Sequence, residues 1–180
     1  MFAQALAEIV RRLDDAKARG LLDQYALIGG FAVSAWGIPR ATQDVDFALA
    51  IGSTDPATLS RHLHTEFQPG EADDPLRGVF RTHVTVDDGS VPVQLILLPS
   101  KWNSIVFQNV ESLPLLGQTV QVVSWQALIL LKLYAGGPQD WLDAQHILTI
   151  HQPSESDRQT VDALAKQLGL SAAWNRLLTQ

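Results

Sequence analysis

The feature that most constrains this chain is a pair of glycines, Gly29 and Gly30, followed further on by two aspartates, Asp44 and Asp46. The glycines come directly after the apolar run Tyr25–Ile28, and thirteen residues separate Gly30 from Asp44. Glycine lets a backbone approach a phosphate closely, and a helix N-terminus presents free N–H groups to it. Aspartates two residues apart in a strand point to the same side, because strand side chains alternate. The pattern therefore predicts a site for Mg²⁺ and nucleotide phosphates, which suits phosphoryl or nucleotidyl transfer.

Composition sets broad limits on what the chain can be. Its 180 residues are 46% hydrophobic and 18% charged, which is ordinary for a globular protein and sufficient for one buried core. The formal net charge of −6 argues against a chain that coats nucleic acid, although a local basic groove stays open. Because cysteine is absent, the sequence excludes a disulfide framework and a thiolate metal site.

Two apolar stretches bear on the location of the protein. The N-terminal segment Met1–Gly20 is amphipathic and lacks the apolar core of a signal peptide. The most apolar run, Ala127–Leu131, is too short to span a bilayer. These patterns predict a soluble, cytoplasmic protein with no membrane partner.

Apolar periodicity and turn residues predict that the first half of the chain alternates between helices and strands. The segment Gln68–Gly78 contains several prolines, glycines and aspartates, and we predict a loop there. The predicted elements before it are a helix over 2–19, a strand over Tyr25–Ile28, a short helix over Phe31–Trp36, a strand over Asp44–Ala50 and a helix over Pro56–Glu66.

The second half begins with a predicted hairpin and ends in helices. Val79–Val86 and Val91–Leu98 have strand character, and Asp87-Asp88-Gly89-Ser90 between them is a typical hairpin turn. Thr119–Val123 is predicted as one more strand, and Ser124 is a suitable helix N-cap. Predicted helices follow over 125–135, 138–150, 156–168 and 170–179. We therefore expect an α+β fold in one compact unit, with a core over 1–123 and a helical C-terminal lobe over 124–180.

Several polar residues stand close enough to these motifs to take part in a site. Arg40 is either a solvated loop cation or a group that braces a triphosphate or the two carboxylates. Ser34, one turn into the short helix, is a candidate for a phosphate contact. Lys132 lies in a very apolar helix, so its ammonium group must either reach solvent or meet an anion such as a nucleotide phosphate. Asp140 and Asp143 share one face of the next helix, where Asp140 either caps the helix or pairs with Lys132.

Two other kinds of chemistry find little support. Ser34 lacks the context of a nucleophile elbow, so a hydrolase triad is not predicted. The histidines do not have the clustered spacing that a zinc site needs. They are His62, His64, His83, His146 and His151.

The motifs together resemble a known family. Ile28-Gly29-Gly30, followed by the stretch 37–46 that ends in Asp44-Val45-Asp46, resembles the signature of the nucleotidyltransferase (DNA polymerase β-like) superfamily. The downstream stretch Leu131–Asp143 resembles the second characteristic block of its AbiEii-type toxin branch. The similarity spans approximately Tyr25–Leu148.

The resemblance implies a small mixed β-sheet with flanking helices, a helical C-terminal lobe and a nucleotide bound between them. It also implies that Mg²⁺ bridges the triphosphate and activates an acceptor hydroxyl, with pyrophosphate leaving in line. The implied metal ligands are Asp44 and Asp46. The implied catalytic residues are Asp44, Asp46, Lys132 and Asp140, with nucleotide binding by Gly29, Gly30, Ser34, Arg40, Lys132 and Asp143.

The same resemblance implies an NTP as donor and leaves the acceptor open. In toxin-like members the acceptor can be a tRNA end, and other members modify proteins or small molecules such as aminoglycosides. A cognate antitoxin is a candidate partner. The acidic balance of the chain would suit a cationic small-molecule acceptor.

Two positions depart from the family pattern. The family commonly places a third acid on a later strand, where this chain has Gln94, a neutral amide that adds no charge and cannot serve as a base. Gln139 stands where a basic residue often precedes the aspartate. An inactive relative that binds a nucleotide or a partner protein is therefore a second hypothesis beside the enzyme.

Overall fold

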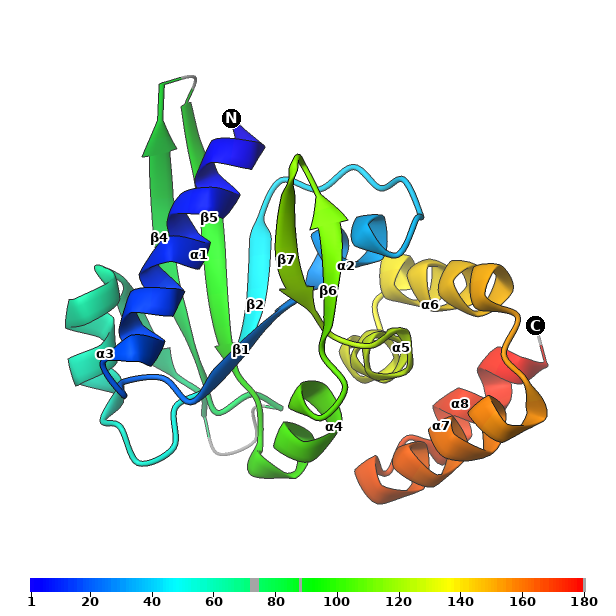
Figure 1. Cartoon of the computed structure of the whole chain (residues 1–180). Helices are drawn as coiled ribbons and strands as arrows, with labels where there is room; N and C mark the ends of the chain where they lie inside the picture. Colours follow the sequence, from blue (N-terminus) through cyan, green and yellow to red (C-terminus); the bar gives the residue numbers. More distant parts are fainter. Residues whose placement is uncertain (72–74, 88, 180) are drawn as a thin grey trace.

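The computed structural model describes residues 1–71, 75–87 and 89–179, which are built around one mixed β-sheet (Figure 1). Seven strands in this part of the chain lie in the order β3-β4-β5-β2-β1-β7-β6. The pairs β2–β5 and β1–β7 are parallel, and the other neighbouring strands are antiparallel. The strands are β1 (Gln24–Ile28), β2 (Val45–Ala50), β3 (Glu66–Pro69), β4 (Gly78–Val86), β5 (Gly89–Leu97), β6 (Glu111–Leu115) and β7 (Gln118–Val122).

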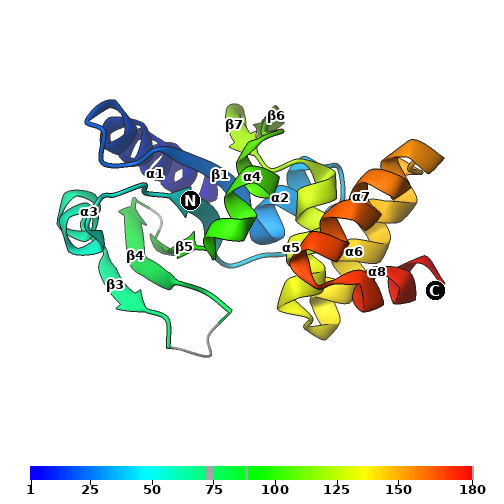
Figure 2. The same cartoon turned by 90° about the horizontal axis from the view of Figure 1, so that it is seen from below.

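Helices cover the sheet and continue as a group beyond it (Figure 1, Figure 2). α1 packs along one face of the sheet, in contact with β4 and β7, whereas α2 follows β1 directly and contacts β2. The last three helices lie beyond α5, on the side away from β3 and β4 (Figure 2). The helices are α1 (Phe2–Ala18), α2 (Gly29–Ala35), α3 (Pro56–Leu63), a 3₁₀ turn (Ser100–Trp102), α4 (Asn103–Phe107), α5 (Trp125–Ala135), α6 (Pro138–His151), α7 (Glu155–Leu168) and α8 (Ser171–Leu178).

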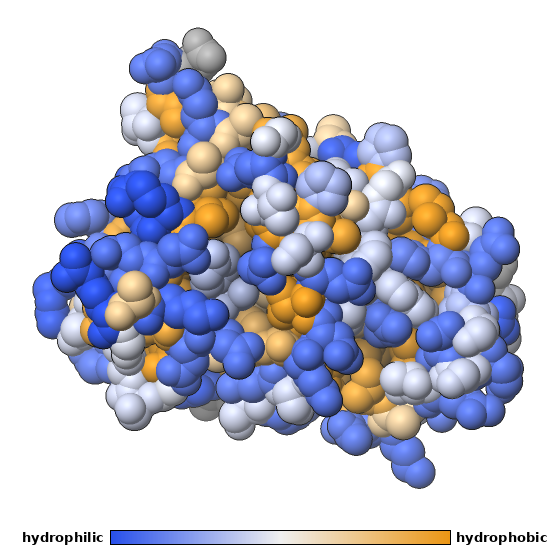
Figure 3. Space-filling model, viewed as in Figure 1, coloured by the Kyte–Doolittle hydropathy of each residue, from blue (hydrophilic) through white to orange (hydrophobic). Residues whose placement is uncertain are grey.

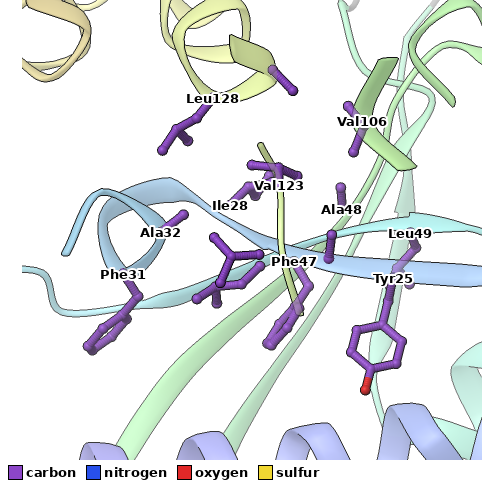
Figure 4. Packing of buried hydrophobic residues seen from close by; sticks show 14 of the residues in the cluster. Tyr25, Ile28, Phe31, Ala32, Phe47, Ala48, Leu49, Val106, Val123 and Leu128 are labelled. Carbon is purple, nitrogen blue, oxygen red and sulfur yellow. The ribbon is translucent and has the colours of Figure 1, made fainter. Parts of the chain in front are cut away.

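The alternation of side chains along β2 divides the core into two layers. Tyr25 and Phe47 point toward α1, and their rings meet edge to face with centroids 5.7 Å apart (Figure 4). Ala48 lies on the opposite side of the sheet, together with Val106 of α4 and Leu128 of α5 (Figure 4). A slip of one residue would exchange the two faces, so the apolar pattern fixes the register. Asp46, two residues before Ala48, is thereby placed on the α5 side.

The position of β2 between β1 and β5 brings distant motifs together. In the registers of these two pairs, Asp46 stands opposite Ile28, the residue before the glycines, and opposite Gln94. Because β2 and β5 are parallel while β1 and β2 are antiparallel, the end of β1 meets the start of β2. The fold thus joins the glycine turn, the aspartates and Gln94 at one point.

The structure confirms the α+β fold class and most of the predicted elements, and the ends of these elements differ from the prediction by a few residues. The predicted helix over Pro56–Glu66 is too long, because α3 ends at Leu63 and the next residue, His64, takes a left-handed conformation with φ 54°. Asp44 lies just before β2 rather than inside it. The predicted turn residue Asp88, and residues 72–74 of the predicted loop, lie outside the described residues.

Four elements were not predicted. The start of the predicted loop Gln68–Gly78 belongs to strand β3, which pairs with β4 so that the rings of Phe67 and Phe80 lie 4.6 Å apart. The 3₁₀ turn, α4 and β6 were not predicted either. Strand β6 joins β7 through Leu116-Gly117, both with positive φ, a hairpin geometry that usually carries Asn-Gly. A leucine in this position gives no turn signal, so the hairpin escaped prediction.

The outside of the molecule shows how the apolar residues are distributed. On the face seen in Figure 3, hydrophilic residues predominate and apolar residues form small separate patches. The exposed large apolar side chains, among them Leu142 and Ile150 on α6, are few compared with the buried ones. None of the helices within the described residues combines the length and the apolar character that crossing a membrane requires.

Candidate active site

A cavity of about 430 Å³ lies where β1, β2 and β5 face helix α5. One part of its wall is apolar and includes Ile96 and Leu98 from the β5 side and Leu128 and Leu131 from α5. The rest is polar and contains most of the residues predicted from the sequence. They are Gly29, Gly30, Arg40, Asp44, Asp46, Gln94, Lys132 and Asp140.

The two glycines leave no room for side chains. Gly29 has φ +67°, which favours glycine, and a Cβ at this position would collide with the carboxylate of Asp46. A Cβ on Gly30 would collide with the guanidinium of Arg40 and with Thr42. The backbone corner is therefore in direct contact with the acidic residue on one side and with a cation on the other.

The two aspartates differ in their surroundings. Asp44 accepts hydrogen bonds from Thr42 Oγ1 at 3.1 Å and from Gln94 Nε2 at 3.3 Å. Burial, and after it the charge of Asp44, raises the pKa of Asp46 to about 7. Lys132 and Arg40 act in the opposite direction but do not compensate fully. The site thus holds two acids that a cation would stabilise in their charged form.

The donor set fits one Mg²⁺ ion. Mg²⁺ is commonly held by one or two carboxylates and completed by waters and substrate phosphates. Asp44 and Asp46 supply the carboxylates, and Gln94 adds a neutral amide beside Asp44. No group of three or more His, Cys, Asp or Glu residues suited to a metal occurs in the described ranges. The two-carboxylate arrangement is therefore the one that the structure offers.

Lys132 meets anions instead of reaching solvent. It is 6% exposed, and its Nζ lies 2.9 Å from Asp140 Oδ1 and 2.8 Å from Asp143 Oδ2. Asp140 also accepts a hydrogen bond from the Gly137 backbone N–H at 3.3 Å, which caps α6. Both alternatives considered for Asp140 are therefore realised, because one oxygen caps the helix and the other binds the lysine.

Asp143 and Ser34 do not line the cavity. Asp143 is 1% exposed and lies behind the wall, where it pairs with Lys132 and, at 3.2 Å, with Nε of Arg40. The Arg40 pair rests on charge, because the two atoms do not have hydrogen-bond alignment. The Ser34 hydroxyl donates to the backbone oxygens of Gly30 and Arg40 at 3.3 and 3.5 Å. The structure thus gives Ser34 a role inside its own turn.

The supporting roles of two residues, Thr42 and Gln139, were not predicted from the sequence. Thr42 holds Asp44, and its position two residues before an aspartate is a recognisable local hydrogen-bonding pattern. Gln139 donates to Asp143 Oδ1 at 3.1 Å. A basic residue at position 139 would add a third cation beside Asp143, which already contacts Lys132 and Arg40.

The chain has a nucleotidyltransferase fold, because almost its whole length superposes on solved structures of this kind. ANT(2'')-Ia in complex with adenylyl-2''-tobramycin is 13% identical, with a TM-score of 0.56 over 97% of both chains. A nucleotidyltransferase-like protein from Paracoccidioides brasiliensis is 17% identical, with a TM-score of 0.53 over 95% of this chain and 91% of that one. These likenesses establish the fold.

Sequence comparisons give no further assignment. No protein-family model matches the chain, and no curated protein matches it. The structural neighbours show the fold that the motifs led us to expect, and membership of the nucleotidyltransferase superfamily stays a prediction. The AbiEii-type branch stays a prediction.

Proposed function

We propose that this protein transfers a nucleoside monophosphate from an NTP to an acceptor hydroxyl and releases pyrophosphate. The observation that carries the proposal is the convergence of Gly29, Asp44, Asp46 and Lys132 on one cavity. The carboxylate of Asp46 occupies the space beside the Gly29 backbone, so a cation on this acid would adjoin a phosphate lying on the glycine corner.

In this proposal Asp44 and Asp46 hold Mg²⁺, with the amide oxygen of Gln94 available as a neutral ligand. The bound ion would supply charge neutralisation on the triphosphate and polarisation of the acceptor oxygen. Thr42 and Gln94 orient Asp44 through the hydrogen bonds described above. The protein holds the two carboxylates together in a partly buried position, where they bind a cation more strongly than they would in water.

The remaining polar residues would bind the polyphosphate. The glycine corner lets phosphate oxygens approach backbone N–H groups at the start of α2. Lys132 and Arg40, which both contact Oδ2 of Asp143, would neutralise phosphate charge at the polar wall of the cavity. Asp140 fixes Lys132 through its 2.9 Å ion pair, so that the ammonium group is held at the cavity wall.

The acceptor has two candidates. The sequence resemblance favours a tRNA end, which would fit a toxin with a cognate antitoxin. The second candidate is a cationic small molecule of the aminoglycoside class. The cavity wall has three acidic side chains and two basic ones, which suits a cation, and ANT(2'')-Ia carries an adenylylated aminoglycoside in its structure.

The test is incubation of the full chain with Mg²⁺, NTPs labelled at the α-phosphate, and either total tRNA or an aminoglycoside panel. Label on RNA supports the first acceptor, and label on the drug supports the second. We expect Asp46→Asn to abolish transfer and Asp162→Asn, an exposed aspartate on α7, to leave it unchanged. Binding of Mg²⁺ and NTP without transfer to any acceptor would favour the inactive relative instead, and unchanged transfer in Asp46→Asn would refute the site.

A further inference from the structure

One buried carboxylate contacts both cations of the cavity. Oδ2 of Asp143 lies 2.8 Å from Lys132 Nζ and 3.2 Å from Arg40 Nε, and Oδ1 accepts a hydrogen bond from Gln139. Burial of a carboxylate is costly unless cations and hydrogen bonds compensate it. Both oxygens of Asp143 contact neighbouring side chains, so we expect Asp143 to hold these side chains in place and not to bind a ligand itself.

These pairs connect parts of the chain that are distant in sequence. Arg40 lies in the connection between α2 and β2, whereas Lys132 and Asp143 belong to α5 and α6. The ion pair between Arg40 and Asp143 therefore ties the sheet to the helices that follow it. The tie lies directly beside the polar wall of the cavity.

Arg40 needs such an anchor to occupy its place. Its guanidinium packs where a side chain on Gly30 would lie, over the glycine corner. An arginine side chain in a loop has many rotamers, so ordering it in one conformation carries an entropic cost. Asp143, which is almost completely buried, supplies the fixed partner that selects this conformation.

We propose that Asp143 is a positioning residue for nucleotide binding and acts through Arg40, whose guanidinium it holds over the Gly29–Gly30 corner. The inference rests on the proposed function, because it requires the polyphosphate to bind at that corner. Asp140 provides a natural contrast. It lies on the same helix and pairs with the same Lys132, but the described residues give it no ion pair with Arg40.

The test is a double-mutant cycle on NTP affinity, measured by isothermal titration calorimetry with Mg²⁺ and the full chain. The probe is whichever of ATP, GTP, CTP and UTP the wild-type chain binds most tightly. Arg40→Gln and Asp143→Asn should each weaken binding about tenfold, and the double variant should also be about tenfold weaker, because both substitutions remove one interaction. In the control cycle, the effects of Arg40→Gln and Asp140→Asn should multiply.

A merely structural role of Asp143 would give a different result. Asp143→Asn would then lower the free energy of unfolding, but its effect on NTP affinity would be the same with and without Arg40, and that outcome would overturn the inference. If Asp143→Asn alone does not fold, the double variant Arg40→Gln/Asp143→Asn, which is neutral at both positions, takes its place in the test. This double variant should bind NTP as tightly as Arg40→Gln does. Weaker binding by the double variant would contradict the inference. Absence of NTP binding by the wild-type chain would overturn the proposed function and this inference with it.

Discussion

At the scale of single residues, the space around a glycine decides how strongly its replacement by alanine destabilises the protein. Gly20 and Gly29 both have positive φ, at +71° and +67°. A Cβ on Gly20 would meet no atom within 4 Å, whereas one on Gly29 would collide with the Asp46 carboxylate. An alanine would suffer backbone strain at both positions, and at Gly29 it would also meet a carboxylate.

Comparison of Gly29→Ala with Gly20→Ala should therefore isolate the contact with Asp46. We expect Gly20→Ala to lower the free energy of unfolding by about 1 kcal/mol, the cost of a left-handed alanine. Gly29→Ala should cost roughly 2–4 kcal/mol, because it must also displace the carboxylate, and it should weaken Mg²⁺ binding. Urea unfolding and Mg²⁺ titration measure the two effects. Equal costs at the two positions would show that the corner and Asp46 are not in contact.

The raised pKa of Asp46 gives a pH dependence with a definite sign. Its pKa is about 7 in the folded protein, against an ordinary value of 3.8. The proton on Asp46 therefore stabilises the folded state fully below pH 4, and this contribution is lost as the pH rises to 7. Without metal, Asp46→Asn should be more stable than wild type at pH 8 by roughly 1–3 kcal/mol.

The measurement is urea unfolding in EDTA at pH 5 and pH 8, with Asp162→Asn as the control. Added Mg²⁺ should stabilise the wild-type chain at pH 8 and have little effect on Asp46→Asn, because a ligand that binds the folded state alone raises its stability. Parallel pH curves for wild type and Asp46→Asn would contradict the raised pKa.

Gln94 is the neutral residue of the proposed metal site. Gln94→Glu replaces its hydrogen bond to Asp44 with a third negative charge, so we expect Mg²⁺ affinity to rise about tenfold. Without metal the same change should lower stability through repulsion. Gln121→Glu, at an exposed glutamine on β7, is the control. An unchanged Mg²⁺ titration in Gln94→Glu would place position 94 outside the metal shell.

At the scale of elements, the ends of three helices meet around one histidine. His151, the last residue of α6, stacks on Trp125 at the start of α5, with ring centroids 5.0 Å apart. Its other side meets Trp36, the residue that caps the end of α2, at 4.9 Å. The Trp36 indole also donates to the backbone oxygen of Val123. This aromatic cluster joins the sheet side of the molecule to its C-terminal helices.

Burial lowers the pKa of His151, so its neutral form favours folding. That contribution is present above the ordinary histidine pKa of 6.5 and is lost as the pH falls below it. Wild type should therefore lose more stability than His151→Phe between pH 7 and pH 5. Because the ring is partly exposed, we expect a difference below about 1 kcal/mol. Urea unfolding of both chains measures it, and His146→Phe, exposed on the same helix, is the control. No difference between wild type and His151→Phe would rule out this contribution.

At the scale of the whole molecule, we expect the negative charge of the protein to favour binding of an NTP that already carries Mg²⁺. The chain carries a net charge of −6, and acids outnumber bases among the side chains that line the cavity. A free triphosphate would be repelled by Asp44 and Asp46, whereas Mg²⁺ reverses the sign of that field. We expect NTP affinity at pH 8 to fall at least about tenfold when EDTA replaces Mg²⁺. The Asp44→Asn/Asp46→Asn double variant should lose this metal dependence, and equal wild-type affinity under both conditions would contradict the argument.

Much of the fold was predictable because its elements carry local signals. Apolar periodicity identified most helices, and the glycine corner and the aspartates were identified from residue type and spacing. β3 and β6 were missed because they are short edge strands whose pairing, not their composition, makes them strands. The approach of Gln94 to Asp44 was not visible either, because it depends on the parallel pairing of β2 with β5.

The sequence by itself determined which residues could form a site: Gly29, Gly30, Asp44, Asp46 and Lys132, each recognisable because its chemistry is unusual where it stands. Only the tertiary structure decided which groups each polar side chain contacts. It turned the Ser34 hydroxyl to the backbone, placed Asp143 behind the cavity wall, and brought Arg40 and Lys132 to one carboxylate. The physical reason is that a side chain's chemistry is local, whereas its partners are set by packing between segments far apart in the chain.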